Sequence, residues 1–175
     1  MGALYGAVLW VLAASPPPAV AALGIPIPGA DPTGSVDSAA ALNRAVRALC
    51  NATAAAPAVP RDAVLDLDNG VYLLSAPIGI DRTVHCSGVL RIVSGTLLAS
   101  NALGGAGTEN AFLVTVVGYW AGLGVSIDRV TFASNGTGGG LRVDDAGHVH
   151  VSDSRFLNFN SVGIWVRQFR HHRFM

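Results

Sequence analysis

The acidic residues near the C-terminal end are the ones whose type and spacing could do acid–base chemistry. Asp144 and Asp145 are the only adjacent carboxylates in the sequence, and Asp153 follows shortly after them. Two carboxylates can act as general acid and general base in a hydrolase or a lyase. The Ala-Gly pair at 146–147 indicates a turn, so a solvated corner is the alternative for Asp144 and Asp145. Asp153 lies between apolar residues expected to point inward, where it could reach a groove.

Two histidines and one glutamate complete the candidates. His148 and His150 share a face at a spacing of i and i+2, where they could contact a metal or a sugar. No third ligand is evident, so the alternative is an ordinary surface. Glu109 follows the glycine-rich stretch 104–107 and is expected to be a solvated loop charge. No HExxH, CxxC or EF-hand pattern occurs, and we expect neither a metal nor a cofactor.

The composition excludes several classes of protein. The chain has 175 residues, and its 11 Arg balance 11 acids without a single Lys. P-loop ATPases and Schiff-base enzymes need a lysine amine, so both are excluded. A neutral chain gives no electrostatic reason to expect nucleic acid or an anionic membrane as a partner. Abundant Asp and Gly favour turns, while Val, Leu and Ile favour strands, which predicts one mostly β domain.

Residues 1–21 have the pattern of a secretory signal peptide. The apolar run at 2–14 is shorter than the roughly 20 residues that span a membrane, and prolines follow it. The triplet at 19–21 (Ala-Val-Ala) fits the small-x-small cleavage pattern, which predicts cleavage after Ala21 and an extracellular protein. An uncleaved anchor and a buried hairpin are the alternatives.

Secretion would bear on two other features. Asn51 and Asn135 each begin an Asn-x-Thr acceptor pattern for N-glycosylation. Cys50 and Cys86 are the two cysteines of the chain, and thiols in an oxidising compartment tend to pair. Two free buried thiols are the alternative, and the sequence does not give the distance between them.

The secondary structure that must position the candidate residues is predicted to differ from one part of the chain to the next. Residues 22–37 form a turn-rich entry, and Asp37 and Ser38 can cap a helix. Apolar residues at helical spacing then predict one amphipathic helix over 38–50, and the proline-broken stretch 51–62 is expected to be a loop. From residue 63 onward, short strand patterns repeat every 23 to 25 residues. The overlays are Val64–Ser75 with Val89–Ser100, Ile127 with Val151, Phe132 with Phe156, and Leu141–Val143 with Ile164–Val166.

A strand repeat of this length predicts a parallel β-helix over residues 51–166. Equivalent side chains would then stack in ladders about 4.8 Å apart. The helix at 38–50 would cover the open strand edges of the first coil. A leucine-rich repeat would need a Leu/Asn frame that is not visible, and an immunoglobulin-like sandwich would give no ladder at fixed spacing.

The opening motif resembles that of a known group of proteins. The segment Gly29–Gly34, with Asp37 and Ser38 before an Ala/Leu helix, is similar to the start of the pectin-lyase-like superfamily, in the branch with a pectate-lyase-type N-terminal domain. Other stretches look like plant quartet-type polygalacturonases, and the resemblance covers about residues 28–166. These stretches are 93–100, 135–141, 149–156 and 161–164.

This resemblance implies a secreted, right-handed parallel β-helix that acts on pectin, with the sugar chain in a groove along the coils. Polygalacturonases are inverting hydrolases with two carboxylates about 6.5 to 9.5 Å apart. The Asn-Thr-Asp, Gly-His-Gly and Arg-x-Lys signatures of that family are absent from this sequence. The resemblance therefore implies the family without its catalytic coils.

The C-terminal segment 167–175 is basic and lacks strand alternation, which indicates a shortened or frame-shifted product; a real tail that binds acidic pectin is the alternative. We expect the N-terminal part of a secreted polygalacturonase-like β-helix protein, monomeric and with little or no hydrolytic activity. A non-catalytic β-helix that binds pectin or another cell-wall polysaccharide is the second hypothesis. An enzyme that uses Asp144, Asp145 or Asp153 is the third.

Overall fold

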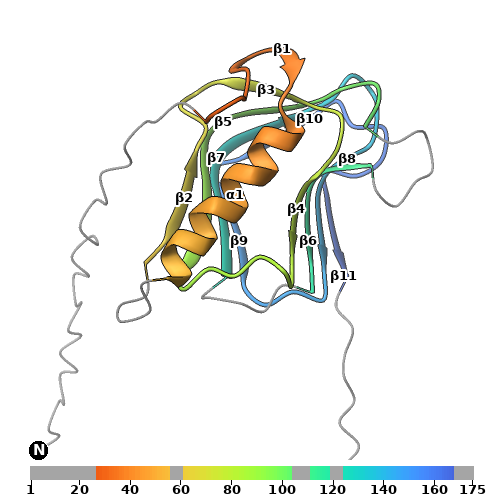
Figure 1. Cartoon of the computed structure of the whole chain (residues 1–175). Helices are drawn as coiled ribbons and strands as arrows, with labels where there is room; N and C mark the ends of the chain where they lie inside the picture. Colours follow the sequence, from red (N-terminus) through yellow and green to blue (C-terminus); the bar gives the residue numbers. More distant parts are fainter. Residues whose placement is uncertain (1–26, 56–60, 104–110, 119–123, 168–175) are drawn as a thin grey trace, which may run out of the picture.

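The computed structural model describes residues 27–55, 61–103, 111–118 and 124–167. Over these residues the protein is mostly β, with parallel sheets and one helix, as predicted (Figure 1). The elements are β1 (Thr33–Asp37), α1 (Ala39–Ala54), β2 (Ala63–Asp66), β3 (Val71–Leu74), β4 (Ile78–Asp81), β5 (Val89–Ala99), β6 (Phe112–Val117), β7 (Gly124–Ala133), β8 (Gly139–Asp144), β9 (Val149–Ser152), β10 (Arg155–Leu157) and β11 (Ile164–Arg167).

The strands form two sheets between which the chain passes back and forth. The larger sheet has the order β1-β3-β5-β7-β10, with β2 also paired to β5 and β9 also paired to β7. The smaller sheet has the order β11-β8-β6-β4. All pairs in both sheets are parallel. From β4 onward, each return to a sheet adds a strand beside the previous one, as Figure 1 shows.

The register confirms most of the overlays found in the sequence, but the period of 23 to 25 residues does not hold throughout: β4 and β6 pair at a shift of 36, β5 and β7 at 35, and β6 and β8 at 27. Ile127 pairs with Val151, and Phe132 pairs with Phe156, both at a shift of 24 residues. The strand β11 follows β8 at a shift of 23, with Ile164 opposite Leu141. The second half of the first overlay is also correct, since β3 pairs with β5 at a shift of 25.

The first half of that overlay is wrong by two residues. The overlay places Leu65 beside Leu90, whereas in the structure Leu65 pairs with Ile92. The earlier corner holds two residues with positive φ, Asp68 and Asn69, whereas the matching corner of β5 holds only Ser94. The two extra residues are accommodated in that corner, so the alternation of inward and outward side chains is unchanged.

Corner residues with positive φ stack on one another from strand to strand. Ser94 in β5 and Arg129 in β7 lie between register pairs of these strands, and both are left-handed. Other corners are joined by hydrogen bonds: Gly118 N–H donates to the Asp144 carbonyl (2.9 Å), and Gly136 N–H donates to that of Asn158 (2.9 Å). The same bend therefore recurs at equivalent places along the chain.

The core lies between the two sheets and beneath α1. Apolar side chains of successive strands stack in rows, for example Ile92 on Ile127, both of them buried. The helix α1 adds its apolar side, which includes Leu42 and Val46, and it packs against β2 and β4 (Figure 1). The side chain of Asn43 accepts a hydrogen bond from Gly79 N–H and donates one to the Pro77 carbonyl, both at 2.9 Å. One N–H group of the edge strand β4, and the carbonyl just before the strand, thereby find a partner in a helix side chain.

The helix differs at its C-terminal end from the prediction over 38–50. It continues to Ala54, so the expected loop 51–62 begins later. Thr53 donates its hydroxyl to the Cys50 carbonyl (2.8 Å), and Ala55 N–H donates to the Asn51 carbonyl (3.1 Å). These bonds, together with the high helix propensity of alanine, extend the last turn.

Several predicted segments lie outside the described residues. They are the signal peptide at 1–21, Glu109 and the basic tail beyond Arg167. The one helix of the described chain is too short and too polar to cross a bilayer.

Candidate functional site: a groove on the outer face of the larger sheet

Alternating burial along β5, β7 and β9 turns polar side chains of these strands toward solvent. Leu90 and Val125 are buried, so their neighbours Arg91 and Ser126 face outward. Arg91 is the register partner of Ser126, and Ser126 is that of His150. Because adjacent strands lie about 4.8 Å apart, the three side chains form a row that crosses the strands.

The row lies in an open groove of about 430 Å³. Asp62 is the carboxylate in its wall, and its Oδ1 accepts a hydrogen bond from Val89 N–H (3.1 Å). The groove therefore presents one permanent cation, two histidines, a hydroxyl and a carboxylate to solvent. Its lining residues are Asp62, Val89, Arg91, Val125, Ser126, His148, Val149 and His150.

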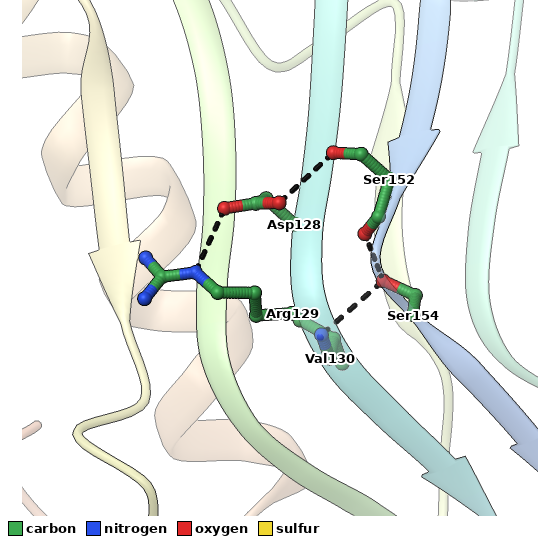
Figure 2. A network of polar contacts seen from close by, with 5 residues as sticks. All are labelled: Asp128, Arg129, Val130, Ser152 and Ser154. Atoms are coloured by element: carbon green, nitrogen blue, oxygen red, sulfur yellow. Dashed lines mark hydrogen bonds and ion pairs between the residues drawn. The ribbon is translucent and has the colours of Figure 1, made fainter.

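Asp128 lies two residues after Ser126 in β7 and is held in a polar network (Figure 2). Its carboxylate accepts hydrogen bonds from Arg129 Nε (3.0 Å) and Ser152 Oγ (2.9 Å). Ser154 Oγ donates to the Ser152 carbonyl (2.8 Å) and accepts from Val130 N–H (3.2 Å). The hydrogen bond from Arg129 lowers the pKa of Asp128, and the bond from Ser152 and the charges of Arg129 and Arg91 lower it further. Asp128 is thus an anion that holds the corner together.

The backbone of His148 is fixed against the start of β7. Val125 N–H donates to the His148 carbonyl (2.8 Å). Gly124, at φ +118, lets this carbonyl approach closely, because a Cβ there would overlap the carbonyl oxygen. His148 and His150 are both exposed and lie in the same groove wall, so the structure brings these two candidates together.

The predicted acidic candidates lie elsewhere. Asp144 ends β8, is only 5 % exposed, and forms an ion pair with Arg142, whose Nε lies 2.7 Å from Oδ2. Asp145 follows in a left-handed corner, and its N–H donates to the Arg167 carbonyl (2.9 Å). Asp153 is exposed at the left-handed corner between β9 and β10. The expected solvated corner is therefore wrong for Asp144, which is buried because it lies against Arg142 on the sheet.

A further pair of carboxylates was missed from the sequence. Asp81 and Asp144 are both register partners of Val117, so their Cα atoms lie about 10 Å apart across β6. Asp81 accepts hydrogen bonds from the Thr83 hydroxyl (2.6 Å) and Thr83 N–H (2.8 Å), and these lower its pKa. A general acid needs a raised pKa, so a carboxylate held as an anion is unsuited to that role.

The motif residues that resemble the pectin-lyase-like start lie in the turn before β1, in β1 itself and at the start of α1. Asp31 N–H donates to Ser38 Oγ (2.9 Å), which leaves α1 without a side-chain cap from Ser38. Asp37 accepts from the Ser75 hydroxyl (2.6 Å), from Ser75 N–H (2.9 Å) and from Ala39 N–H (3.2 Å). Desolvation raises the pKa of Asp37, but these hydrogen bonds outweigh it, so the pKa is lowered. The motif joins β1, α1 and β3.

The two acceptor asparagines and the two cysteines take different positions. Asn51 is exposed in the last turn of α1, and Asn135 is exposed in the bend after β7. Cys50 of α1 is joined by a disulfide to Cys86, which precedes β5. Of the two alternatives for the cysteines, the structure has the paired one.

Arg91, Ser126 and Asp128 were not identified from the sequence. β5 and β7 pair at a shift of 35 residues, whereas the overlays had suggested 23 to 25. The register between β5 and β7 was the information needed to find that these side chains are neighbours, and the sequence did not supply it.

The groove is suited to binding a ligand that carries both negative charge and hydroxyl groups. Arginine and histidine can pair with a carboxylate, while Ser126 and Asp62 can exchange hydrogen bonds with hydroxyls. In the described part of the chain, no three His, Cys, Asp or Glu side chains are grouped so that they could hold a metal ion. Comparisons with protein families, curated proteins and solved structures found no match for the chain.

Proposed function

We propose that the described chain forms coils of a right-handed parallel β-helix of the pectin-lyase-like kind. The alternation of the chain between two parallel sheets and the stacked left-handed corners support this architecture. Connections between parallel strands of one sheet are almost always right-handed, which supports the hand. In this arrangement α1 closes the end of the stack at β2 and β4.

We further propose that the protein is polygalacturonase-like and binds pectic polysaccharide without cleaving it. The observation that carries this proposal is the row of Arg91, Ser126 and His150 across three strands in one groove. A polysaccharide that runs along the stack would meet these side chains in succession. Arg91 would pair with a uronate carboxylate, and the remaining side chains would bind hydroxyls.

Three carboxylates support the part of this proposal that concerns cleavage. Asp81 and Asp128 have lowered pKa values, and Asp144 is paired with Arg142. None of these described groups is prepared to protonate a leaving oxygen. The disulfide between Cys50 and Cys86 fits an oxidising compartment, which supports secretion to the cell wall as part of the proposal.

Binding is tested by affinity electrophoresis of the purified protein in gels with polygalacturonate or with a neutral glucan. We expect retardation by polygalacturonate only, and a loss of about three- to tenfold in affinity for Arg91→Ala. Arg82→Ala removes an exposed arginine outside the groove and is the matched control. Equal binding by the Arg91 and Arg82 variants would overturn the assignment to the groove.

Cleavage is tested separately, by the appearance of reducing ends when the protein is incubated with polygalacturonate. We expect none above the buffer control. Steady release of reducing ends would instead favour an enzyme, and Asp144→Asn, Asp145→Asn and Asp153→Asn would then show which carboxylate is needed. The two assays are independent, so the detection of cleavage would overturn this part of the proposal and leave the result on binding unchanged.

A further inference from the structure

We propose that His148 and His150 form a second carboxylate-binding subsite of the groove, which pairs with a uronate only when the two imidazoles are protonated. This inference rests on the proposed function and deepens it, because it requires a second carboxylate on the ligand besides the one that pairs with Arg91. When the imidazoles are neutral, they exchange hydrogen bonds with hydroxyl groups instead. The groove therefore binds an acidic polysaccharide more tightly as the pH falls.

The sheet holds the two histidines on one face. His148 directly precedes β9, His150 is the second residue of that strand, and both side chains are exposed in the groove wall. Alternate residues of a strand project to the same side, about 6.6 Å apart, so one extended ligand can contact both. The His148 carbonyl accepts a hydrogen bond from Val125 N–H (2.8 Å). The pair is thus attached to β7 through the backbone.

The register separates this subsite from Arg91. His150 is the partner of Ser126, and Ser126 is the partner of Arg91, so two strand spacings, or about 10 Å, lie between the backbones of His150 and Arg91. Positions this far apart suit two carboxylates of one polysaccharide chain. Ser126, which lies between them, is placed to bind a hydroxyl of the same chain.

Three charged groups face the histidines from the neighbouring described elements. Arg91 on β5 is a permanent cation, and Asp62 before β2 is the carboxylate of the groove wall. On β7, Asp128 is ion-paired with Arg129 (3.0 Å), as Figure 2 shows. Histidine is the side chain that ordinarily changes charge between pH 5 and 8. Acidification over this range therefore changes the groove lining from one cation to three.

The ligand keeps its charge over the same range. Carboxyl groups ionise at about pH 4, so a uronate is an anion throughout. A protonated imidazole presents two N–H donors and a positive charge, and hydrogen bonds between charged partners are stronger than neutral ones. Both effects favour binding at the acidic end. A neutral glucan has no carboxylate, so its binding should not gain in this way.

The test is isothermal titration calorimetry of the full chain with oligogalacturonates, at constant ionic strength between about pH 5 and pH 8. We expect affinity about three- to tenfold higher at the acidic end. Binding near neutral pH should also take up protons, which is measured by comparing heats in two buffers of different ionisation enthalpy. The double variant His148→Gln with His150→Gln should lose the pH dependence and the proton uptake.

A matched control separates the groove from the net charge of the protein. The chain has five histidines, and protonation of any of them makes the protein more positive. His85 is exposed before β5 and does not line the groove, so His85→Gln removes one such charge elsewhere. We expect His150→Gln to reduce the pH dependence and His85→Gln to leave it unchanged. Arg91→Ala should weaken binding at every pH and keep the dependence.

Three results would overturn the inference. Wild-type affinity that is equal at both ends of the pH range would remove it and leave the proposed function intact. Equal pH dependence in the His85 and His150 variants would show that net charge is responsible and not the subsite. A protein that binds no oligogalacturonate at any pH would instead overturn the proposed function, and this inference with it.

Discussion

The carboxylate of Asp31 accepts four hydrogen bonds, two from Thr33 and one each from the N–H groups of Ser35 and Val36. Asp66 and Asp81 accept N–H donors two residues onward in the same way. At the residue scale, these three aspartates stabilise turns. Their carboxylates are occupied by local N–H and O–H donors, so none of them is an evident general acid or base. The hydroxyl and N–H of Thr33, followed by the amides of Val36 and Ser35, lower the pKa of Asp31 to about 2.

Asp31→Asn is expected to change how stability depends on pH. The pKa of about 2 in the folded protein lies below the ordinary aspartate value of 3.8, so the stabilisation is fully present above about pH 4 and is lost as the pH falls toward 2. The variant should be less stable at pH 7, and its stability should fall less steeply between pH 4 and 2. Urea unfolding at several pH values measures this, and parallel curves for the two proteins would contradict it.

Two glycines with positive φ allow backbone strain to be separated from crowding. Gly124→Ala would place a methyl group against the His148 carbonyl, whereas Gly136→Ala meets nothing within 4 Å. We expect Gly136→Ala to lower the free energy of unfolding by about 1 kcal/mol, and Gly124→Ala by about 1 to 3 kcal/mol more. Gly124→Ala should also weaken polygalacturonate binding, because it displaces His148. Equal effects of the two substitutions on stability would show that the contact is unimportant.

At the scale of elements, α1 is attached to the sheets in three ways. Its buried side packs on the core, Asn43 bonds the edge of β4, and the disulfide joins Cys50 to the segment before β5. The cysteines are 36 residues apart, so the bridge restricts a long loop of the unfolded chain.

Removal of this bridge should destabilise the protein without abolishing the helix. For the double variant Cys50→Ala with Cys86→Ala, we expect a loss of about 2 to 4 kcal/mol in the free energy of unfolding. Denaturant unfolding measures the loss, and wild type unfolded in the presence of a reductant is the control, which should lose a similar amount. A double variant as stable as the oxidised wild type would contradict a structural role for the bridge.

At the scale of the whole molecule, stability should be graded along the stack of strands. β5 and β7 are each paired on both sides and carry fully buried residues such as Ile92 and Ile127. β10 and β11 lie at edges and are largely exposed. Because each strand contacts mainly its neighbours, opening should start at the exposed end.

Native-state hydrogen exchange checks this gradient. Amides of β5 and β7 are expected to exchange slowest, and those of β10 fastest, with α1 and β4 closer to the slow group because Asn43 binds that edge. β11, an edge strand whose four residues are all exposed, should also exchange fast. Uniform protection of all strands would indicate a single cooperative unit and would contradict the gradient.

The sequence by itself determined the mostly β class, the parallel repeat in its C-terminal half, and the helix. Ile127 with Val151 and Leu141 with Ile164 could be matched because apolar residues and glycines recur at almost constant spacing there. The clustering of His148 and His150 followed from their spacing in one strand segment.

Only the tertiary structure decided which outward side chains are neighbours. The β5–β7 shift of 35 residues depends on the length of the connections, which carry no repeat pattern, so the row of Arg91, Ser126 and His150 could not be read from the sequence. Burial of Asp144 depends likewise on the strands on either side of it, where it is the register partner of Val117 in β6 and of Arg167 in β11. Alternation along a strand is a local property of the backbone, whereas register between strands is set by long-range packing.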